Sequence, residues 1–168
     1  MIDALLFDKD GTLFDFRISW GGWAAGFLAG LARDPAHAET LGRAIGFDAV
    51  TRVFAPDSPV ISATAIDIAT ALAAHLPGQS IADLTDRIDA SAGVAPMAEA
   101  VPLRPLLEGL RRRGLRLGVA TNDSESPARQ HLAAVLAHLG GDQIVQPGVH
   151  RQDQLAVLLP VRRQVVHL

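Results

Sequence analysis

Two aspartates, separated by one residue, follow a short apolar run near the start of the chain. The string DKDGTLFD occupies residues 8–15, directly after the apolar residues 4–7. A short apolar run that ends in a turn-forming cluster predicts a central strand buried on both faces. Asp8 and Asp10 would then leave the end of this strand together. One carboxylate could attack phosphorus while the other protonates the leaving oxygen.

The residues after the aspartates suit a phosphate site. Gly11 permits a tight turn with close backbone approach, and the Thr12 hydroxyl could orient the reacting groups. A second apolar run ends in Thr121 and Asn122. Thr121 would hydrogen-bond a phosphoryl oxygen, and Asn122 would add its backbone amide, as preorganised donors do at a charged phosphorus centre.

The aspartate string has two other interpretations, a calcium loop and a chance surface turn. A calcium loop of the EF-hand type needs oxygen ligands at positions five, seven and twelve and a helix before it. Here the glycine comes too early and the preceding run predicts a strand, which argues against calcium. A chance surface turn is disfavoured because the eight-residue string is specific.

The middle of the chain predicts helices only. Apolar residues recur at helical spacing in residues 19–31, Asp34 and Pro35 predict a second helix start, and Thr64 with Asp67 and Ser80 with Asp83 predict two more. The segment from 19 to 93 is therefore expected to be all helical. Trp20 and Trp23 fit either core packing or contact with a substrate, and Asp15 fits either a hinge or a solvated carboxylate.

Helices and strands alternate after this segment. Residues 103–113 predict a helix closed by Gly114, residues 115–120 a buried strand, residues 126–139 a helix and residues 143–145 a third strand. Such alternation favours an α/β fold with a parallel sheet and helices on both faces, into which the helical segment is inserted. The chemistry is expected at the carboxyl ends of the strands.

The string DKDGTLFD resembles the DxDGTLxD signature of the haloacid dehalogenase-like hydrolases, and Val119-Ala120-Thr121-Asn122 resembles the second motif of that family. The match runs from residue 1 to about 145 and is most similar to phosphoglycolate-phosphatase-type members. The resemblance implies a three-layer Rossmannoid core, residues 1–16 and 97–168, with a helical cap of residues 17–96. It also implies Mg²⁺ held by Asp8 and Asp10, an aspartyl-phosphate at Asp8, and Asp10 as acid and then base.

The C-terminal quarter departs from the family pattern. Family enzymes carry a lysine before the fourth strand and paired acids after it, whereas the single lysine of this chain is Lys9. If the strand continued, alternation would point Lys9 away from the face of Asp8 and Asp10. Loss of one preorganised donor costs about 10²–10³ in rate, so slow or absent hydrolysis is expected. A frameshift, truncation or divergence would explain the altered end.

Possible substitutes for the missing cation are Arg151, Arg162 and Arg163, although their spacing fits surface charges better. Residues 154–160 predict a helix and residues 161–168 a strand beside the first. Without that strand, the first strand would have an open edge, which predicts association or poor solubility. The histidines, His131 among them, show no metal-ligand spacing.

Composition excludes several classes of function. A net charge of −3 gives no case for nucleic-acid or anionic-membrane partners, and the chain has no cysteine for disulfides or a thiol nucleophile. The most apolar stretch, residues 20–32, is shorter than the ~20 residues of a spanning helix, so the cytoplasm is the expected location.

The expected ligand is a small phosphorylated metabolite. A non-catalytic module that binds a phosphorylated ligand or a partner protein, and a phosphomutase, remain alternatives.

Overall fold

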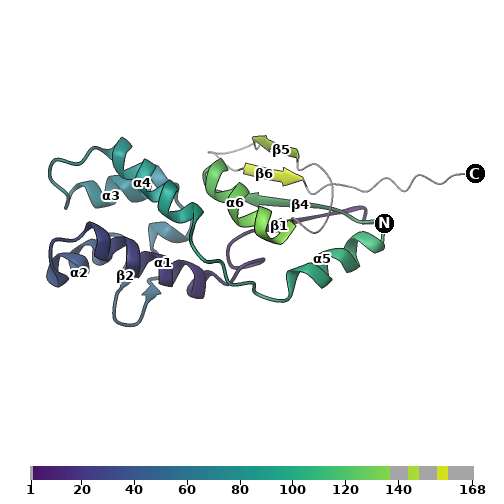
Figure 1. Cartoon of the computed structure of the whole chain (residues 1–168), viewed down its shortest axis with the longest axis horizontal. Coiled ribbons are helices and arrows are strands. Elements are labelled where there is room, and N and C mark those ends of the chain that lie inside the picture. Colours follow the sequence, from purple (N-terminus) through teal and green to yellow (C-terminus); the bar gives the residue numbers. More distant parts are fainter. Residues whose placement is uncertain (1, 137–143, 148–154, 159–168) are drawn as a thin grey trace, which may run out of the picture.

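The computed structural model describes residues 2–136, 144–147 and 155–158 of the 168-residue chain. In chain order the described elements are β1 (Ala4–Asp8), α1 (Phe16–Leu31), α2 (Pro35–Ala44), β2 (Phe47–Asp48), β3 (Val53–Phe54), the 3₁₀ helix η1 (Pro59–Ile61), α3 (Ala65–Ala73), α4 (Ile81–Gly93), α5 (Leu103–Arg112), β4 (Arg116–Thr121), α6 (Glu125–Leu136), β5 (Ile144–Pro147) and β6 (Leu155–Leu158). Helices α1–α4 gather at one end of the molecule, and the larger sheet lies with α5 and α6 at the other (Figure 1).

The larger sheet confirms the predicted α/β class. Strand β1 pairs in parallel with β4, from Ala4 opposite Arg116 to Asp8 opposite Ala120. The described strand order is β1-β4-β6-β5, and β6 runs antiparallel to both β4 and β5. The helix predicted for residues 154–160 is wrong in its described part, because residues 155–158 form β6. A four-residue apolar run does not distinguish a strand from a helix.

The position of β1 differs from the prediction. It is an edge strand of the described sheet rather than a central one, and Leu6 is 66% exposed. By contrast β4 has a neighbour on each side, and Val119 is fully buried. An apolar run predicts a strand but does not tell which strands flank it. The strand predicted for residues 161–168 beside β1 lies outside the described residues.

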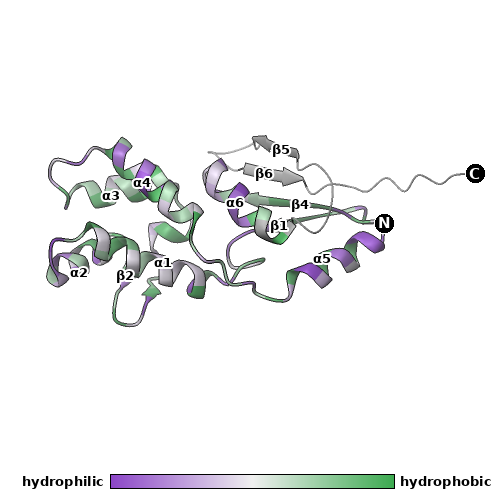
Figure 2. Cartoon of the chain, in the orientation of Figure 1, coloured by the Kyte–Doolittle hydropathy of each residue, from purple (hydrophilic) through white to green (hydrophobic). Residues whose placement is uncertain are grey.

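The helix starts predicted at Asp34, Thr64 and Ser80 are confirmed, whereas α1 and α6 begin at Phe16 and Glu125, before the predicted positions 19 and 126. Asp34 accepts a hydrogen bond from the backbone N–H of His37, and Thr64 forms a reciprocal capping box with Asp67. Helix α5 ends just before Gly114, whose φ of +82° suits glycine. In Figure 2, helix α5 shows alternating hydrophilic and hydrophobic residues, while β4 is mainly hydrophobic. None of the helices in the described ranges is long and apolar enough to cross a membrane.

The segment from 19 to 93 is not all helical. Strands β2 and β3 form an antiparallel hairpin in which Phe47 is paired with Phe54, and their ring centroids lie 4.8 Å apart. The helix η1 follows, capped by Ser58. Strands of two residues are too short to show the period-two pattern, so the sequence did not reveal the hairpin.

Two hydrophobic clusters organise the molecule. The first is built by the segment from 17 to 96, called the helical insertion below, with Leu41, Leu72 and Leu84 all fully buried. The second joins β1 and β4 to α5 and α6. Met97 packs against both clusters, which places the second connection to the insertion between them.

The two connections to the helical insertion are bonded to each other. Asp15 N donates to Ala98 O (2.8 Å), and Ala100 N donates to Leu13 O (2.9 Å). The Asp15 carboxylate caps α1 by accepting from Ile18 N (2.9 Å). Asp15 is therefore part of the joint between sheet and insertion, which favours the hinge reading over a merely solvated carboxylate.

Two adjacent glycines of α1 give a matched stability prediction. A Cβ on Gly21 would lie 2.6 Å from the carbonyl oxygen of Arg52, whereas a Cβ on Gly22 would meet nothing within 4 Å. Gly22→Ala is expected to stabilise the protein by about 0.5–1 kcal/mol through helix propensity. Gly21→Ala is expected to destabilise it by roughly 1–3 kcal/mol through overpacking. Urea unfolding of both variants measures the difference, and equal effects would contradict the close approach of α1 to the hairpin.

Candidate active site

The DKDGT segment forms a strand end followed by a tight turn. Asp8 is the last residue of β1, is exposed, and accepts a hydrogen bond from the backbone N–H of Lys9 (2.7 Å). The turn is closed by Leu13 N and Phe14 N, which both donate to Lys9 O (3.0 Å). Gly11 has a φ of +79°, a conformation that favours glycine. Asp8 and Asp10 thus lie on either side of the first turn residue, at the carboxyl end of β1.

Asp10 is held by two donors on one oxygen. Its Oδ1 accepts from Lys9 Nζ (2.8 Å) and from the indole Nε1 of Trp20 (2.7 Å). Trp20 is 6% exposed and also belongs to the first hydrophobic cluster. Trp23, in contrast, donates to Ser91 Oγ within the insertion (2.7 Å). Trp20 therefore combines core packing with a contact to the site, while the indole nitrogen of Trp23 is bonded within the insertion.

Lys9 does not point away from the site. Its side chain is fully buried, and Nζ lies 2.8 Å from Asp10 Oδ1, 2.9 Å from Asp123 Oδ2 and 3.3 Å from His131 Nδ1. The alternation argument was wrong because β1 ends at Asp8, so Lys9 belongs to the turn. A buried lysine is stable only when it is paired, and here two carboxylates lie beside it.

Asp123 is a site residue that the sequence analysis missed. Burial raises the pKa of its carboxyl to about 6, although the neighbouring Lys9 opposes this rise. Its Oδ2 forms an ion pair with Lys9 but has no well-directed hydrogen bond within the described part of the chain. The available signal was its place directly after Thr121 and Asn122, at the carboxyl end of β4.

The other predicted site residues lie at the same edge of the sheet. Gly11 and Thr12 are exposed in the turn after β1. Thr121 is 3% exposed, and its Oγ1 accepts from Asp123 N (3.2 Å). Asn122 Nδ2 donates to Ala63 O of the helical insertion (3.0 Å). The side chain of Asn122 thus links sheet to insertion, and its role toward phosphate stays a prediction.

A small cavity of about 50 Å³ lies between the sheet edge and the helical insertion. Its polar end carries Asp10, Asn122 and Asp123 from the sheet side and Asp89 from α4. Burial raises the pKa of Asp89, a hydrogen bond from Ser124 lowers it, and nearby Asp86 raises it. The other walls are mainly apolar or aromatic, including Phe16, Trp20, Trp23, Val60, Ile61, Ile68 and Ile88.

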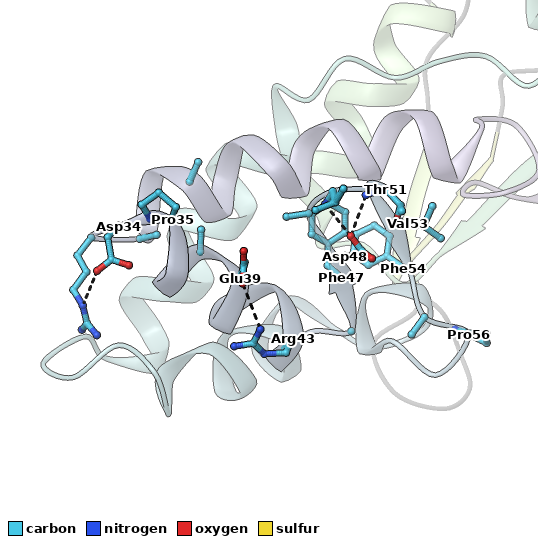
Figure 3. Close-up of a pocket in the computed structure, with 18 residues that line it drawn as sticks. Asp34, Pro35, Glu39, Arg43, Phe47, Asp48, Thr51, Val53, Phe54 and Pro56 are labelled. Carbon is cyan, nitrogen blue, oxygen red and sulfur yellow. Dashed lines mark hydrogen bonds and ion pairs between the residues drawn. The ribbon is translucent and has the colours of Figure 1, made fainter.

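A larger cavity of about 1220 Å³ lies elsewhere, between α1, α2 and the β2–β3 hairpin (Figure 3). Phe47, Val53 and Phe54 are among its lining residues, and its charged rim is paired as Arg33 with Asp34 and Arg43 with Glu39. It shares no lining residue with the smaller cavity. None of the predicted site residues lines it, so size alone does not mark the active site.

The electrostatics of Asp8 suit a nucleophile at a crowded anionic site. Partial burial raises the pKa of the Asp8 carboxyl, the backbone N–H of Lys9 lowers it, and the negative charge of Asp10 raises it. Joint action of the two carboxylates on one phosphate stays a prediction.

The raised pKa of Asp123 predicts a pH dependence of stability. The folded state binds more protons than the unfolded state between pH 3.8 and about 6, so the free energy of unfolding falls as pH rises through this window. Asp123→Asn should remove this contribution. Urea unfolding of both proteins across the window is expected to show the wild type losing stability relative to the variant as pH rises. A constant difference would contradict the effect of burial on Asp123.

The residues present offer Mg²⁺ a partial donor set. Asp8 is exposed, but Asp10 Oδ1 already accepts two hydrogen bonds. Within the described ranges no three acidic or histidine side chains are placed to hold a metal. Mg²⁺ commonly uses one or two carboxylates together with water and substrate phosphate. The set therefore fits a magnesium ion that is completed by solvent and ligand, not one enclosed by protein.

One family of known proteins matches most of this chain. A model of the family described as haloacid dehalogenase-like hydrolase matches residues 2–158. The chain belongs to this family. No curated protein and no solved structure matches the chain. Haloacid dehalogenase-like hydrolases generally use Mg²⁺, which is consistent with the two carboxylates at the end of β1.

The family match extends through β6, beyond the end expected near residue 145. The residues considered as substitutes for the missing cation, Arg151, Arg162 and Arg163, lie outside the described residues. Within the described part, the cation that pairs with the site carboxylates is Lys9.

Proposed function

We propose that this haloacid dehalogenase-like hydrolase cleaves phosphate monoesters of small metabolites through an aspartyl-phosphate at Asp8. The observation that carries the proposal is an exposed Asp8 at the end of β1, two residues before an Asp10 whose Oδ1 is fixed by Lys9 and Trp20. Asp10 lines the cavity next to the helical insertion, which we propose acts as a cap over residues 1–16 and 97–168.

In the first step, an oxygen of Asp8 forms a bond to phosphorus, the bond to the ester oxygen breaks, and Asp10 gives its proton to the leaving alcohol. In the second step, Asp10 takes a proton from water, the water oxygen bonds to phosphorus, and the bond to Asp8 breaks. Phosphate leaves and both carboxyl groups return to their first state. Bound Mg²⁺, with Asp8 and Asp10 among its ligands, would neutralise negative charge on the phosphoryl oxygens.

The phosphate contacts follow from the same edge of the sheet. We propose that Thr12, Thr121 and Asn122 donate to the phosphoryl oxygens. Gly11 would contribute the turn that lets the backbone approach the phosphate, since its own N–H already donates to Phe14 O (2.8 Å). Thr121 Oγ1 accepts from Asp123 N, and a hydroxyl that accepts can still donate its own hydrogen to phosphate. Asn122 Nδ2 donates to Ala63 O of the helical insertion, so the backbone N–H is the group of Asn122 proposed for phosphate.

Hydrolysis of p-nitrophenyl phosphate with and without magnesium tests the proposal. Slow turnover that requires the metal is expected, because the fully buried Lys9 cannot contact phosphate. Absence of turnover over a panel of small phosphate esters at high enzyme concentration would overturn it.

A phosphoglycolate-phosphatase-like activity is the narrower assignment implied by the sequence resemblance, and the charges that line the cavity argue against it. The cavity adds Asp89 and Asp123 to the site, and their ionised forms would repel a second anionic group on the substrate. We expect glycerol phosphate, whose alcohol part is uncharged, to show a higher kcat/KM than phosphoglycolate, which carries a second anionic group. Measuring kcat/KM for both esters with the same enzyme shows which substrate is preferred. A preference for phosphoglycolate would support the narrower assignment.

A second candidate function is a non-catalytic module that binds a phosphorylated ligand. The burial of the only lysine favours it, because no lysine can then neutralise the phosphate during reaction. Calorimetry with phosphate and magnesium distinguishes the two. Binding that survives Asp8→Asn, without turnover by the wild type, would support the module.

A further inference from the structure

The ammonium group of Lys9 is fully satisfied inside the protein. It has three N–H donors, and three acceptors lie within reach: Asp10 Oδ1 at 2.8 Å, Asp123 Oδ2 at 2.9 Å and His131 Nδ1 at 3.3 Å. The side chain is fully buried. Lys9 therefore cannot contact a substrate and must act through the groups that it holds.

The ring of His131 connects Lys9 to the helical insertion. Its Nε2 lies 2.8 Å from the carbonyl oxygen of Ala92 in α4, and a carbonyl only accepts, so Nε2 must carry the hydrogen. Lys9 only donates, so His131 Nδ1 must accept. Both contacts require the same neutral tautomer. Burial, and then the charge of Lys9, lower the pKa of His131, which favours the neutral ring.

Helices α4 and α6 approach closely where this contact is made. A Cβ on Gly93, next to Ala92, would lie 2.7 Å from Gln130 Nε2, next to His131. The glycine thus allows the end of α4 to lie against α6. Movement of α4 away from α6 would break the bond between His131 and Ala92.

We propose that His131 is a positioning residue. The contact with Ala92 of the helical insertion fixes the tautomer of its ring, and the ring, acting through Lys9, fixes the orientation of the Asp10 carboxylate. The chain of contacts runs from Ala92 to His131, to Lys9 and to Asp10. Its kinetic consequence rests on the proposed function, since Asp10 is the acid of that reaction.

The kinetic test uses the leaving group. A positioned acid contributes about 10²–10⁴ in rate where the leaving oxygen needs a proton. His131→Phe is therefore expected to lower kcat for glycerol phosphate roughly 10-fold or more, while kcat for p-nitrophenyl phosphate, whose leaving group is stable as an anion, falls by less than about threefold. KM for both substrates should stay close to the wild-type value.

The matched control is His37→Phe. His37 lies in α2 and is also buried, and its Nε2 lies 3.0 Å from His75 O. Both residues belong to the helical insertion, and neither lines the small cavity at the site. This control should alter stability without changing the ratio of the two rates. An equal loss for both substrates in His131→Phe, or the same ratio change in His37→Phe, would overturn the proposal.

A second measurement does not need turnover or a stable His131 variant. Nitrogen NMR of the histidine rings should show His131 neutral and protonated at Nε2, with resonances that shift in Asp10→Asn but not in the control Asp15→Asn. Protonation at Nδ1, or unchanged resonances in Asp10→Asn, would overturn the positioning chain. If the wild type hydrolyses no ester, the proposed function fails, and this measurement alone decides whether the positioning chain exists.

Discussion

Replacement of Asp8 by Asn is expected to abolish hydrolysis of p-nitrophenyl phosphate, with a loss on the order of 10³-fold or more. An amide is not a nucleophile toward phosphorus, yet its oxygen can still accept the hydrogen bond from Lys9 N that Asp8 accepts at 2.7 Å. The fold should therefore be retained. Initial rates with magnesium present measure the loss, and mass spectrometry of rapidly quenched wild-type enzyme should find the phosphoryl group on Asp8.

The control for this variant is Asp15→Asn. It removes the same charge from the same segment, and asparagine caps a helix about as well as aspartate, so α1 keeps its cap at Ile18 N. Its rate should remain near that of the wild type. If Asp8→Asn were as active as Asp15→Asn, the nucleophile would have to be another residue and the proposed reaction would be wrong.

Lys9→Met should cause the largest loss of stability among single changes at the site. Methionine preserves most of the apolar stem, but it leaves Asp10 and Asp123, whose side chains are only 15% and 16% exposed, without their cation. Removal of one partner of a buried ion pair typically costs about 3–5 kcal/mol, because the remaining charge stays desolvated. Urea unfolding at neutral pH measures the loss.

Two comparisons separate this effect from loss of charge in general. Arg33→Met removes an exposed partner of Asp34 and should change stability by less than about 1 kcal/mol. Lys9→Met combined with Asp123→Leu should lose less than Lys9→Met alone, since one stranded carboxylate is gone. A Lys9→Met protein as stable as the wild type would mean that solvent reaches the two carboxylates, contrary to their burial.

Local signals in the sequence were enough to predict most of the helices and the motif. The helix starts at Asp34, Thr64 and Ser80 were found because a capping side chain bonds to backbone only two or three residues away. The turn after β1 was predicted for the same reason, since Gly11 meets a purely local conformational need. The family resemblance rested on that segment too, and the family match confirmed it.

The tertiary structure alone decided what surrounds the two aspartates. Lys9 and His131 are 122 residues apart, and no local pattern indicates that they touch. The same holds for the edge position of β1 and for Asp123, whose pKa depends on burial by distant elements. Backbone conformation is set by neighbours along the chain, whereas desolvation and the pairing of charges depend on which segments pack together. For this reason the sequence indicated the two aspartates and their chemistry, whereas packing determined which distant residues hold the side chain of Asp10 in place.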